Sequence, residues 1–281
     1  MKVGFIGTGN MGSLLIDAFI AAGALEPHQI TASNRTRTKT EQLSERYPGL
    51  KSAANNRETA ACSHILFLCV KPLEFHHVLQ EIQDVTTPDQ IAVSITSPVQ
   101  LRHLESRLPC KISKIIPSIT HLAGSGASLC IHGDRMQMED RSLLEELFAS
   151  ISRPLQVSEN FTRITSDFSS CGPAFLAFFL DQWIAAAVKL TGMEQQDLIR
   201  LSGEMLLGTG KLLTESGLTP GELQARVSVR GGITAEALAV LDAHLNNAFE
   251  QLIMTTQAKY DEDVHKLDRQ FDISEVNRQQ Y

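Results

Sequence analysis

Three glycines near the start of the chain have the spacing of a phosphate-binding turn. Gly7, Gly9 and Gly12 follow a short apolar run in the segment VGFIGTGNMG. In such a pattern the first glycine permits a tight turn, the second lets a pyrophosphate approach the backbone, and the third lets helix and strand pack closely. The start of the helix adds free N–H groups and a partial positive charge. A plain strand-to-helix turn is the alternative, and the context favours dinucleotide binding.

The end of the next expected strand indicates which dinucleotide binds. A site for NAD usually carries Asp or Glu there to hold the ribose 2′-hydroxyl. This chain instead has Ser33, Asn34 and Arg35, followed by Arg37 and Lys39. A guanidinium and hydroxyl groups suit a dianionic 2′-phosphate. A solvated basic loop is the alternative, but the position favours NADPH, with NADH a weaker candidate.

Apolar runs and helical periods alternate over the first half of the chain. Strands are expected at residues 3–7, 29–34, 64–70, 90–95, 110–117, 126–132 and 154–159, and helices at 10–23, 38–47 and 138–151. This alternation predicts βαβ units with right-handed crossovers. The expected fold class is therefore α/β, with an N-terminal Rossmann domain built on a doubly wound parallel sheet.

After about Asn160 the pattern becomes helical, which predicts an all-α second domain. We expect a dinucleotide-binding domain over residues 1–160 and a helical domain over 161–281. Apolar residues crowd the first long helix of that domain: Phe175, Phe178, Phe179 and Trp183. Exposed patches of this kind mark interfaces, so a homodimer through the helical domain is expected. The last residues, 261–281, are mostly polar and are expected to pack loosely.

Composition excludes several classes of protein. The chain has 281 residues, with 25 basic against 32 acidic residues and a net charge of −7, which argues against nucleic acid as a partner. No signal peptide is evident, and the run PAFLAFFL is broken by Asp181, so no membrane span is expected. The five scattered cysteines lack metal-ligand spacing and indicate reduced thiols. We therefore expect a cytoplasmic protein without a metal site.

Six segments in their order resemble the pyrroline-5-carboxylate reductase family, which reduces a cyclic imine in proline synthesis. The resemblance runs from residue 1 to about 260. The segments are VGFIGTGNMG, Val70-Lys71-Pro72, Val93-Ser94-Ile95, CGPAF, GTGKLL and VSVRGGITAEAL. It implies a Rossmann domain followed by a helical domain that interlocks in a dimer, or in a higher oligomer, with a small imine acid as substrate.

The resemblance also implies a set of cofactor-binding residues. Those at the pyrophosphate would be Ile6, Gly7, Thr8, Gly9, Asn10 and Met11, and those at the 2′-phosphate Ser33, Asn34 and Arg35. Those at the adenosine and the nicotinamide ribose would be Asn56, Val70, Lys71, Thr96 and Ser97. A strand-end lysine paired with an acid is the alternative interpretation of Lys71.

A second glycine-rich turn, at Arg230, Gly231 and Gly232, precedes another helix. A simple helix start is its alternative interpretation. The resemblance implies that these three residues bind the substrate carboxylate through free N–H groups. It also implies that the Thr234 hydroxyl is catalytic, with a hydrogen bond to the imine nitrogen as hydride arrives at carbon.

Departures from the family pattern fall on the substrate side. Val229 replaces a serine and Arg230 a proline, and the chain has Ser118-Ile119-Thr120 and Ser169-Ser170-Cys171 where the family has other residues. Segments such as ITSPVQ and SCGPAF resemble the reductase-like branch encoded in a Bacillus competence operon. An inactive or weakly active dinucleotide-binding homologue with a regulatory, competence-related role is thus the alternative function. A β-hydroxy acid dehydrogenase is disfavoured, because Lys189 lies at the far end of its helix.

Overall fold

The chain forms two compact units in the computed structural model, which describes residues 1–273. Unit 1 comprises Met1–Pro173 together with the chain from Thr255 onward, and unit 2 is Ala174–Met254.

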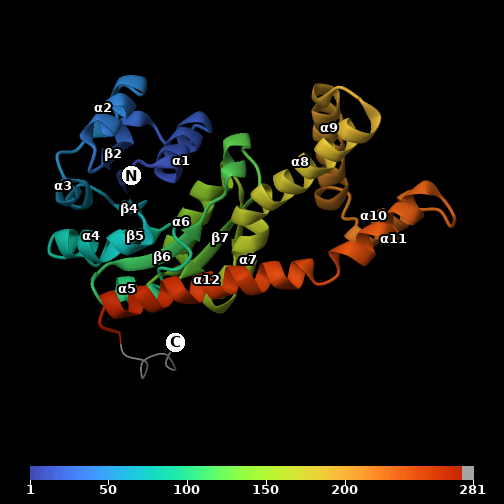
Figure 1. Cartoon of the computed structure of the whole chain (residues 1–281). Coiled ribbons are helices and arrows are strands. Elements are labelled where there is room, and N and C mark those ends of the chain that lie inside the picture. The colour runs from blue at the N-terminus through green and yellow to red at the C-terminus, as the bar shows by residue number, and fades with distance from the viewer. Residues whose placement is uncertain (274–281) are drawn as a thin grey trace. The chain divides into compact units, whose positions relative to one another are not determined.

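Unit 1 is built on one eight-stranded sheet with the order β3-β2-β1-β4-β5-β6-β7-β8 (Figure 1). The strands are β1 (Val3–Ile6), β2 (Ile30–Ser33), β3 (Lys51–Ser52), β4 (Ile65–Leu68), β5 (Ile91–Ser94), β6 (Lys111–Ile116), β7 (Ala127–His132) and β8 (Arg153–Gln156). After β1 the chain builds β2 and β3 on one side and then returns to add β4 on the other. This reversal of strand order is the Rossmann topology, and it confirms the predicted fold class.

The sequence predicted a parallel sheet, but one pair of strands in it is antiparallel. β6 and β7 pair antiparallel, from Ser113 opposite His132 to Ile116 opposite Leu129. Antiparallel neighbours can be joined by a short connection, whereas parallel ones need a crossover. The connection after Ile116 holds only the short 3₁₀ segment Ile119–Ala123, so β7 reverses direction. The two-residue strand β3 was not predicted, because only Thr31–Lys51 and Ala32–Ser52 pair there.

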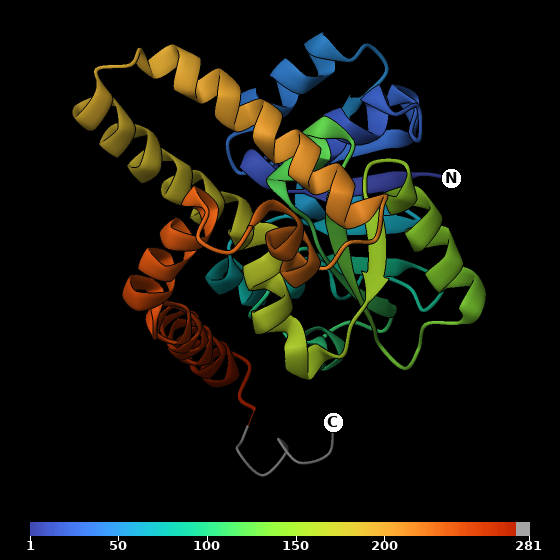
Figure 2. The same ribbon diagram turned by 90° about the vertical axis from the view of Figure 1, so that its right-hand side faces the viewer.

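Helices cover both faces of the sheet, as the two views show (Figures 1 and 2). Phe5 and Phe67 stack at 4.8 Å between ring centroids on one face, and Phe19 and Phe148 join them. The helices on this face are α1 (Asn10–Ala21), α2 (Arg37–Arg46) and α6 (Met138–Ala149). Those on the other face are α3 (Asn56–Ala61), α4 (Phe75–Ile82), α5 (Leu101–Glu105) and the end of α12 (Ala248–Gln270). Strands buried on both faces explain the continuous apolar runs in the sequence.

The end of α12 belongs to the core of unit 1, so the expectation of loose packing is wrong for residues 261–273. Leu267 is fully buried and Phe271 is 3% exposed, both in the cluster that contains α4 and α5. Asp268 accepts hydrogen bonds from Arg102 at 2.8 Å and lies 2.9 Å from Nε2 of the buried His103. The apolar residues of α12 recur at helical spacing, which accounts for its packing despite its polar composition. Residues 274–281 lie outside the described part of the chain.

The compact units divide the chain elsewhere than near residue 160. Unit 1 continues to Pro173, through α7 (Thr162–Ser166) and the π-helical segment Asp167–Cys171, and regains the chain at Thr255. The reason is packing: Thr256 of α12 donates a 2.6 Å hydrogen bond to Asp167, whose carboxylate also accepts from Arg163. The second unit is therefore an insertion between two parts of the first.

Unit 2 is entirely helical over its described length, which confirms the second part of the fold prediction. It contains most of α8 (Gly172–Thr191), α9 (Gln195–Thr214), α10 (Pro220–Val227), α11 (Ile233–Leu245) and the first part of α12. No residue of α8, α9, α10 or α11 is buried within this single chain. Phe178 and Trp183 are 68% and 59% exposed. Helices with such faces need a covering surface.

The helical run Glu159–Thr191 has the length and apolar composition of a membrane span, with a mean hydropathy of 1.5. The run PAFLAFFL was expected to be too short for a span because it ends at Asp181, but the helix itself continues through Asp181 to Thr191, as expected. None of the apolar window is buried in the chain.

Candidate functional site

The turn between β1 and α1 is tightly enclosed by the chain at two of its three glycines. Gly7 has φ 95°, a conformation that residues with a side chain rarely adopt, and a Cβ there would lie 2.6 Å from the carbonyl oxygen of Cys69. A Cβ on Gly12 would lie 2.2 Å from the carbonyl oxygen of Gly7. These two glycines are required by the turn and by close helix packing.

Gly9 is different, because no contact within residues 1–273 requires a glycine there. Its φ of −76° and ψ of −166° are open to any residue, and a Cβ at this position would meet no atom within 4 Å. Gly9 also caps α1 without any side-chain hydrogen bond, and the first turn of α1 has no acidic residue. A phosphate that binds to backbone N–H groups needs a residue without a side chain next to a helix N-terminus. Gly9 meets this requirement.

The carboxyl ends of the central strands meet beside this turn. Ile6 pairs with Ser33 and with Leu68, and Leu68 pairs with Ser94, so β1, β2, β4 and β5 end in register. The reversal of strand order falls between β1 and β4. Open α/β sheets bind their ligands at such a point, which brings the predicted cofactor residues of unit 1 to one edge.

Polar side chains at the end of β2 are hydrogen-bonded to one another. Asn34 donates to the Thr8 hydroxyl at 2.9 Å and accepts from the Thr36 amide at 2.9 Å. Ser33 donates to Asn56 at 2.8 Å, and Asn56 in turn donates to Glu81 at 2.5 Å. These hydrogen bonds fix the loop that carries Arg35, and contacts of Ser33, Asn34 and Asn56 with a cofactor remain a prediction.

Arg35 is the accessible cation of this loop. Its side chain is 87% exposed and lies 3.6 Å from the carboxylate of Glu74. An exposed ion pair of this length contributes little, so Arg35 can exchange this partner for a phosphate. Arg37 is paired with Glu41 at 3.1 Å on α2, whereas Lys39 has no ion-pair partner among residues 1–273.

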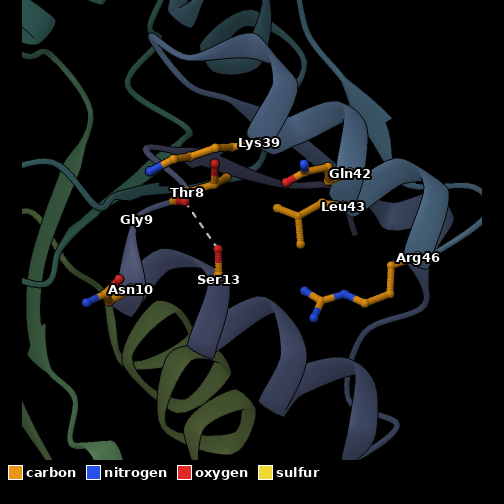
Figure 3. Close-up of a pocket in the computed structure, with 8 residues that line it drawn as sticks. All are labelled: Thr8, Gly9, Asn10, Ser13, Lys39, Gln42, Leu43 and Arg46. Atoms are coloured by element: carbon orange, nitrogen blue, oxygen red, sulfur yellow. Dashed lines mark hydrogen bonds between the residues drawn. The ribbon is translucent and has the colours of Figure 1, made fainter.

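A cavity of about 410 Å³ lies between the glycine turn and α2 (Figure 3). The residues that line it are Thr8, Gly9, Asn10, Ser13, Lys39, Gln42, Leu43 and Arg46. Figure 3 shows Lys39 reaching over Thr8 and Gly9, and the Ser13 hydroxyl donates to the Thr8 carbonyl at 3.2 Å. Ser13, Gln42, Leu43 and Arg46 were not predicted. The signal for the last three was the helical spacing of residues 39, 42, 43 and 46 on one face of α2.

The remaining predicted cofactor residues follow β4 and β5. Val70 lies against the turn, with its Cγ1 3.1 Å from the position of a Cβ on Gly7. Lys71 caps the 3₁₀ segment Pro72–Glu74 without a side-chain hydrogen bond. Thr96 and Ser97 follow β5, where the Thr96 hydroxyl lies 3.2 Å from that of Ser94. The described residues hold no cluster of His, Cys, Asp and Glu suited to a metal.

The second glycine-rich turn lies in unit 2, between α10 and α11. Gly231 has φ 73°, and Gly232 caps α11 without a side-chain hydrogen bond. Thr234 is in the first turn of α11 and is half-buried, while Arg230 is exposed. The predicted glycine-rich turn before a helix is therefore present at these residues. Their position relative to the cofactor residues of unit 1 remains a prediction.

Cys171 closes the π-helical segment that leads into α8. Its sulfur accepts a hydrogen bond from Arg163 at 3.1 Å, and the side chain is half-buried rather than fully buried. Ser118 donates to the Ser169 carbonyl at 2.9 Å across the same region. π-Helical segments recur at functional sites, and this one begins the segment whose sequence departs from the family pattern.

Two family profiles match successive parts of the chain. One described as "NADP oxidoreductase coenzyme F420-dependent" matches residues 2–98, and one described as "Pyrroline-5-carboxylate reductase dimerisation" matches residues 159–263. The first covers the glycine turn and the ends of β2, β4 and β5. The second covers the exposed apolar helices and the second glycine-rich turn.

Whole-length relatives agree with these profiles. The chain is 38% identical to ComE operon protein 4 of Bacillus subtilis over 97% of this chain and 100% of the relative. It is 32% identical to pyrroline-5-carboxylate reductase 2 of Bos taurus over 86% of this chain and 77% of the relative. A crystal structure of Plasmodium falciparum pyrroline carboxylate reductase with NADP bound has the same fold, at a TM-score of 0.81 and 23% identity over 96% of this chain and 98% of that one.

Proposed function

Because this chain belongs to the pyrroline-5-carboxylate reductase family, we propose that it uses NADPH to reduce 1-pyrroline-5-carboxylate, or a closely related cyclic imine acid. The product would be proline or its counterpart. The observation that carries this proposal is the glycine at position 9. No contact within residues 1–273 excludes a side chain there, and the glycine leaves the start of α1 open to a phosphate.

The residues of unit 1 fit a bound dinucleotide. The N–H groups at the start of α1 would hold the pyrophosphate, and the ends of β4 and β5 would hold the other half of the molecule. When bound, the cofactor supplies a hydride to the imine carbon, while the nitrogen takes up a proton to give a secondary amine. The chain contributes mainly by positioning the two reactants.

Preference for NADPH over NADH rests on the cations beside the end of β2. Arg35 and Lys39 lie where a 2′-phosphate would be placed, and no acidic residue occupies the end of β2 itself. Glu74 is the nearest competitor, but its pair with Arg35 is long and exposed. A dianionic phosphate would take the guanidinium from this single carboxylate.

The turn before α11 would receive the substrate carboxylate. Arg230 offers a charge-assisted contact, and Gly231 and Gly232 leave backbone N–H groups accessible at the helix start. Thr234 would hydrogen-bond the imine nitrogen. Val229 carries no hydroxyl and is 69% exposed, so Arg230 has to supply the polar contact that the family's serine makes.

The helices of unit 2 would pair with those of a second copy of the chain. Their apolar faces are exposed, and the matched dimerisation profile spans the same residues, including the whole run Glu159–Thr191. A homodimer interface accounts for this run better than a membrane does, because the profile continues past it through polar helices. We assign cofactor binding to residues 1–160, which the remaining parts of unit 1 complete, and dimerisation with substrate binding to the helices within 161–281, chiefly those of unit 2. Assembly beyond a dimer is open to measurement.

We also place the protein in the cytoplasm, without nucleic acid as a partner. All five cysteines are free thiols, which suits a reducing compartment. The net charge of −7 repels nucleic acid.

A regulatory homologue with little turnover is the second candidate, and the substitutions at Val229 and Cys171 favour it. One assay separates the two functions: NADPH oxidation by the purified chain with 1-pyrroline-5-carboxylate and a panel of cyclic imine acids. Turnover that saturates with one of them supports the reductase. Tight NADPH binding with no turnover on any of them would transfer the proposal to the regulatory role.

A further inference from the structure

Lys114 on β6 is a charged residue in the interior of unit 1. It is fully buried, which is rare for lysine unless the ammonium has partners. Its Nζ donates to the carboxylate of Glu159 at 2.7 Å and to the carbonyl of Ser97 at 3.2 Å. Burial lowers the pKa of Lys114, and Glu159 opposes this effect. Lys114 therefore ties strand β6 to the loop that follows β5.

Glu159 ties the other end of the same loop. The carboxylate oxygen that accepts from Lys114 also accepts from the backbone N–H of Leu101 at 2.9 Å, at the start of α5. The loop between Ser94 and Leu101 is thus fixed at the Ser97 carbonyl and at the Leu101 amide by one ion pair. Glu159 lies far along the chain, just before α7, so its pairing also joins α7 to the sheet.

This loop occupies the carboxyl end of β5. Because the strand order reverses between β1 and β4, the two halves of a dinucleotide lie on opposite sides of that point. The pyrophosphate turn and the cations Arg35 and Lys39 belong to the adenosine side, so β4 and β5 belong to the nicotinamide side. The Ser97 hydroxyl is buried and has no hydrogen-bond partner within residues 1–273, so a small shift of the loop would free it for a ligand.

We propose that Lys114 and Glu159 are positioning residues that hold the loop 95–100 in place for the nicotinamide half of the cofactor. This inference rests on the proposed function, since it needs a dinucleotide at the edge of the sheet. Neither residue touches the cofactor in this scheme; they act through the backbone of Ser97 and Leu101.

A purely structural role is the competing explanation, and the same strand provides a matched control. Lys111 also lies on β6 and pairs with Asp140 at 2.7 Å, but it sits at the amino end of the strand, away from the site. Replacing either lysine removes an ion pair of the same length from the same strand. Lys114 is the more buried of the two, so its loss can cost more stability. A positioning effect is therefore judged by the ratio of two ligand affinities, which should change only at Lys114.

The test compares two probes that share their adenosine half. NADPH reaches the loop after β5, whereas adenosine 2′,5′-bisphosphate ends near the pyrophosphate turn. Dissociation constants for both are measured on the full chain and on the Lys114→Met, Lys111→Met, Lys114→Arg and Glu159→Gln variants, with thermal unfolding as the check on folding. Lys114→Met should weaken NADPH about tenfold or more while the bisphosphate changes less than about twofold.

The controls fix how each result is interpreted. Lys111→Met should leave the ratio of the two constants unchanged, and Lys114→Arg, which keeps the cation, should recover most of the NADPH affinity. Equal losses for both probes in Lys114→Met, or no loss for either, overturn the proposal. If Lys114→Met does not fold, Glu159→Gln decides, because it keeps the shape and removes the charge: an unchanged ratio in that variant also overturns it. If the wild-type chain binds neither probe, that result contradicts the proposed function, and not only the positioning role of Lys114 and Glu159.

Discussion

The two glycine-rich helix starts of this chain differ in what surrounds them. Before α1, side chains at Gly7 and Gly12 would collide with backbone oxygens at 2.6 and 2.2 Å. Before α11, a Cβ on Gly231 would meet no atom within 4 Å among the described residues, and the nearest atom to one on Gly232 would be Cγ2 of Val229 in the same turn, at 2.7 Å. Ile233, which begins α11, is 91% exposed.

The difference is that one turn is complete within the single chain and the other is not. The turn before α1 is buried at Gly7 and Thr8 and is hydrogen-bonded to its surroundings, which suits the recognition of a dinucleotide. The turn before α11 depends on surfaces beyond its own helices, since no residue of α11 is buried. We therefore propose that substrate selectivity resides in the turn before α11, where Val229 and Arg230 depart from the family pattern.

The largest effect is expected from Gly9→Val. A Cβ at this position would meet no atom within 4 Å among residues 1–273, so the melting temperature should fall by no more than the few degrees that a poorer helix cap costs. NADPH affinity should fall by about 100-fold or more, because the side chain displaces the phosphate. Titration of NADPH fluorescence measures the affinity. Gly7→Ala is the contrasting variant, because its φ of 95° should cost stability as well. Normal NADPH binding by Gly9→Val would remove the main support for the cofactor site.

Thr234→Ala tests the turn before α11. Loss of the hydroxyl should lower kcat by about 100-fold with little change in the dissociation constant of NADPH. Steady-state kinetics and a binding titration on the same preparation measure the two quantities. Thr234→Ser keeps the hydroxyl and should retain most of the activity. A variant that loses NADPH binding along with turnover would show that the two turns do not have separate tasks.

Arg35→Ala should discriminate between cofactors. We expect NADPH to bind about tenfold more weakly while NADH is unaffected, since only NADPH carries the 2′-phosphate. Arg37→Ala is the matched control, because Arg37 is already paired with Glu41. The comparison of the two dissociation constants would contradict the assignment if Arg35→Ala weakened both cofactors equally.

The smallest effect is expected from a change of pH. It acts on the stability of unit 1, through the contacts of Asp268 on α12 with Arg102 and His103 on α5. Burial lowers the pKa of His103. Burial raises the pKa of Asp268, but hydrogen bonds from Arg102 and His103 outweigh this and lower it overall. Both groups then bind protons less readily when folded than when unfolded, so stability falls as pH drops, first below about 6.5 for the histidine and then below about 4 for the carboxylate.

Thermal unfolding between pH 8 and pH 5 measures this loss, which should amount to a few degrees. His103→Gln should unfold at a lower temperature at neutral pH but with a shallower pH dependence. His77→Gln, at a largely exposed position, serves as the control. A pH dependence identical in wild type and His103→Gln would assign the effect to other groups.

The elements that could be predicted from the sequence are those whose patterns involve neighbouring residues. Apolar runs such as ILFL and the glycine spacing of the first turn are readable because strand, turn and helix are neighbours in the chain. The ion pair of Lys114 with Glu159 joins residues far apart in the sequence. No local sequence pattern predicts such a buried pair. The end of α12 was missed for another reason. Leu267 and Phe271 recur at helical spacing, but the surrounding charges concealed a narrow apolar stripe.

The return of α12 to unit 1 has a practical consequence for dissecting the protein. A fragment that stops near residue 160 would lack Leu267 and Phe271, and the apolar surface of α4 and α5 that these two residues cover would face water. Such a fragment should be prone to aggregation, although it contains every cofactor-binding residue assigned to the first turn. To obtain the nucleotide-binding part alone, the chain has to be rejoined across the excised insertion 174–254, so that its last helix is kept.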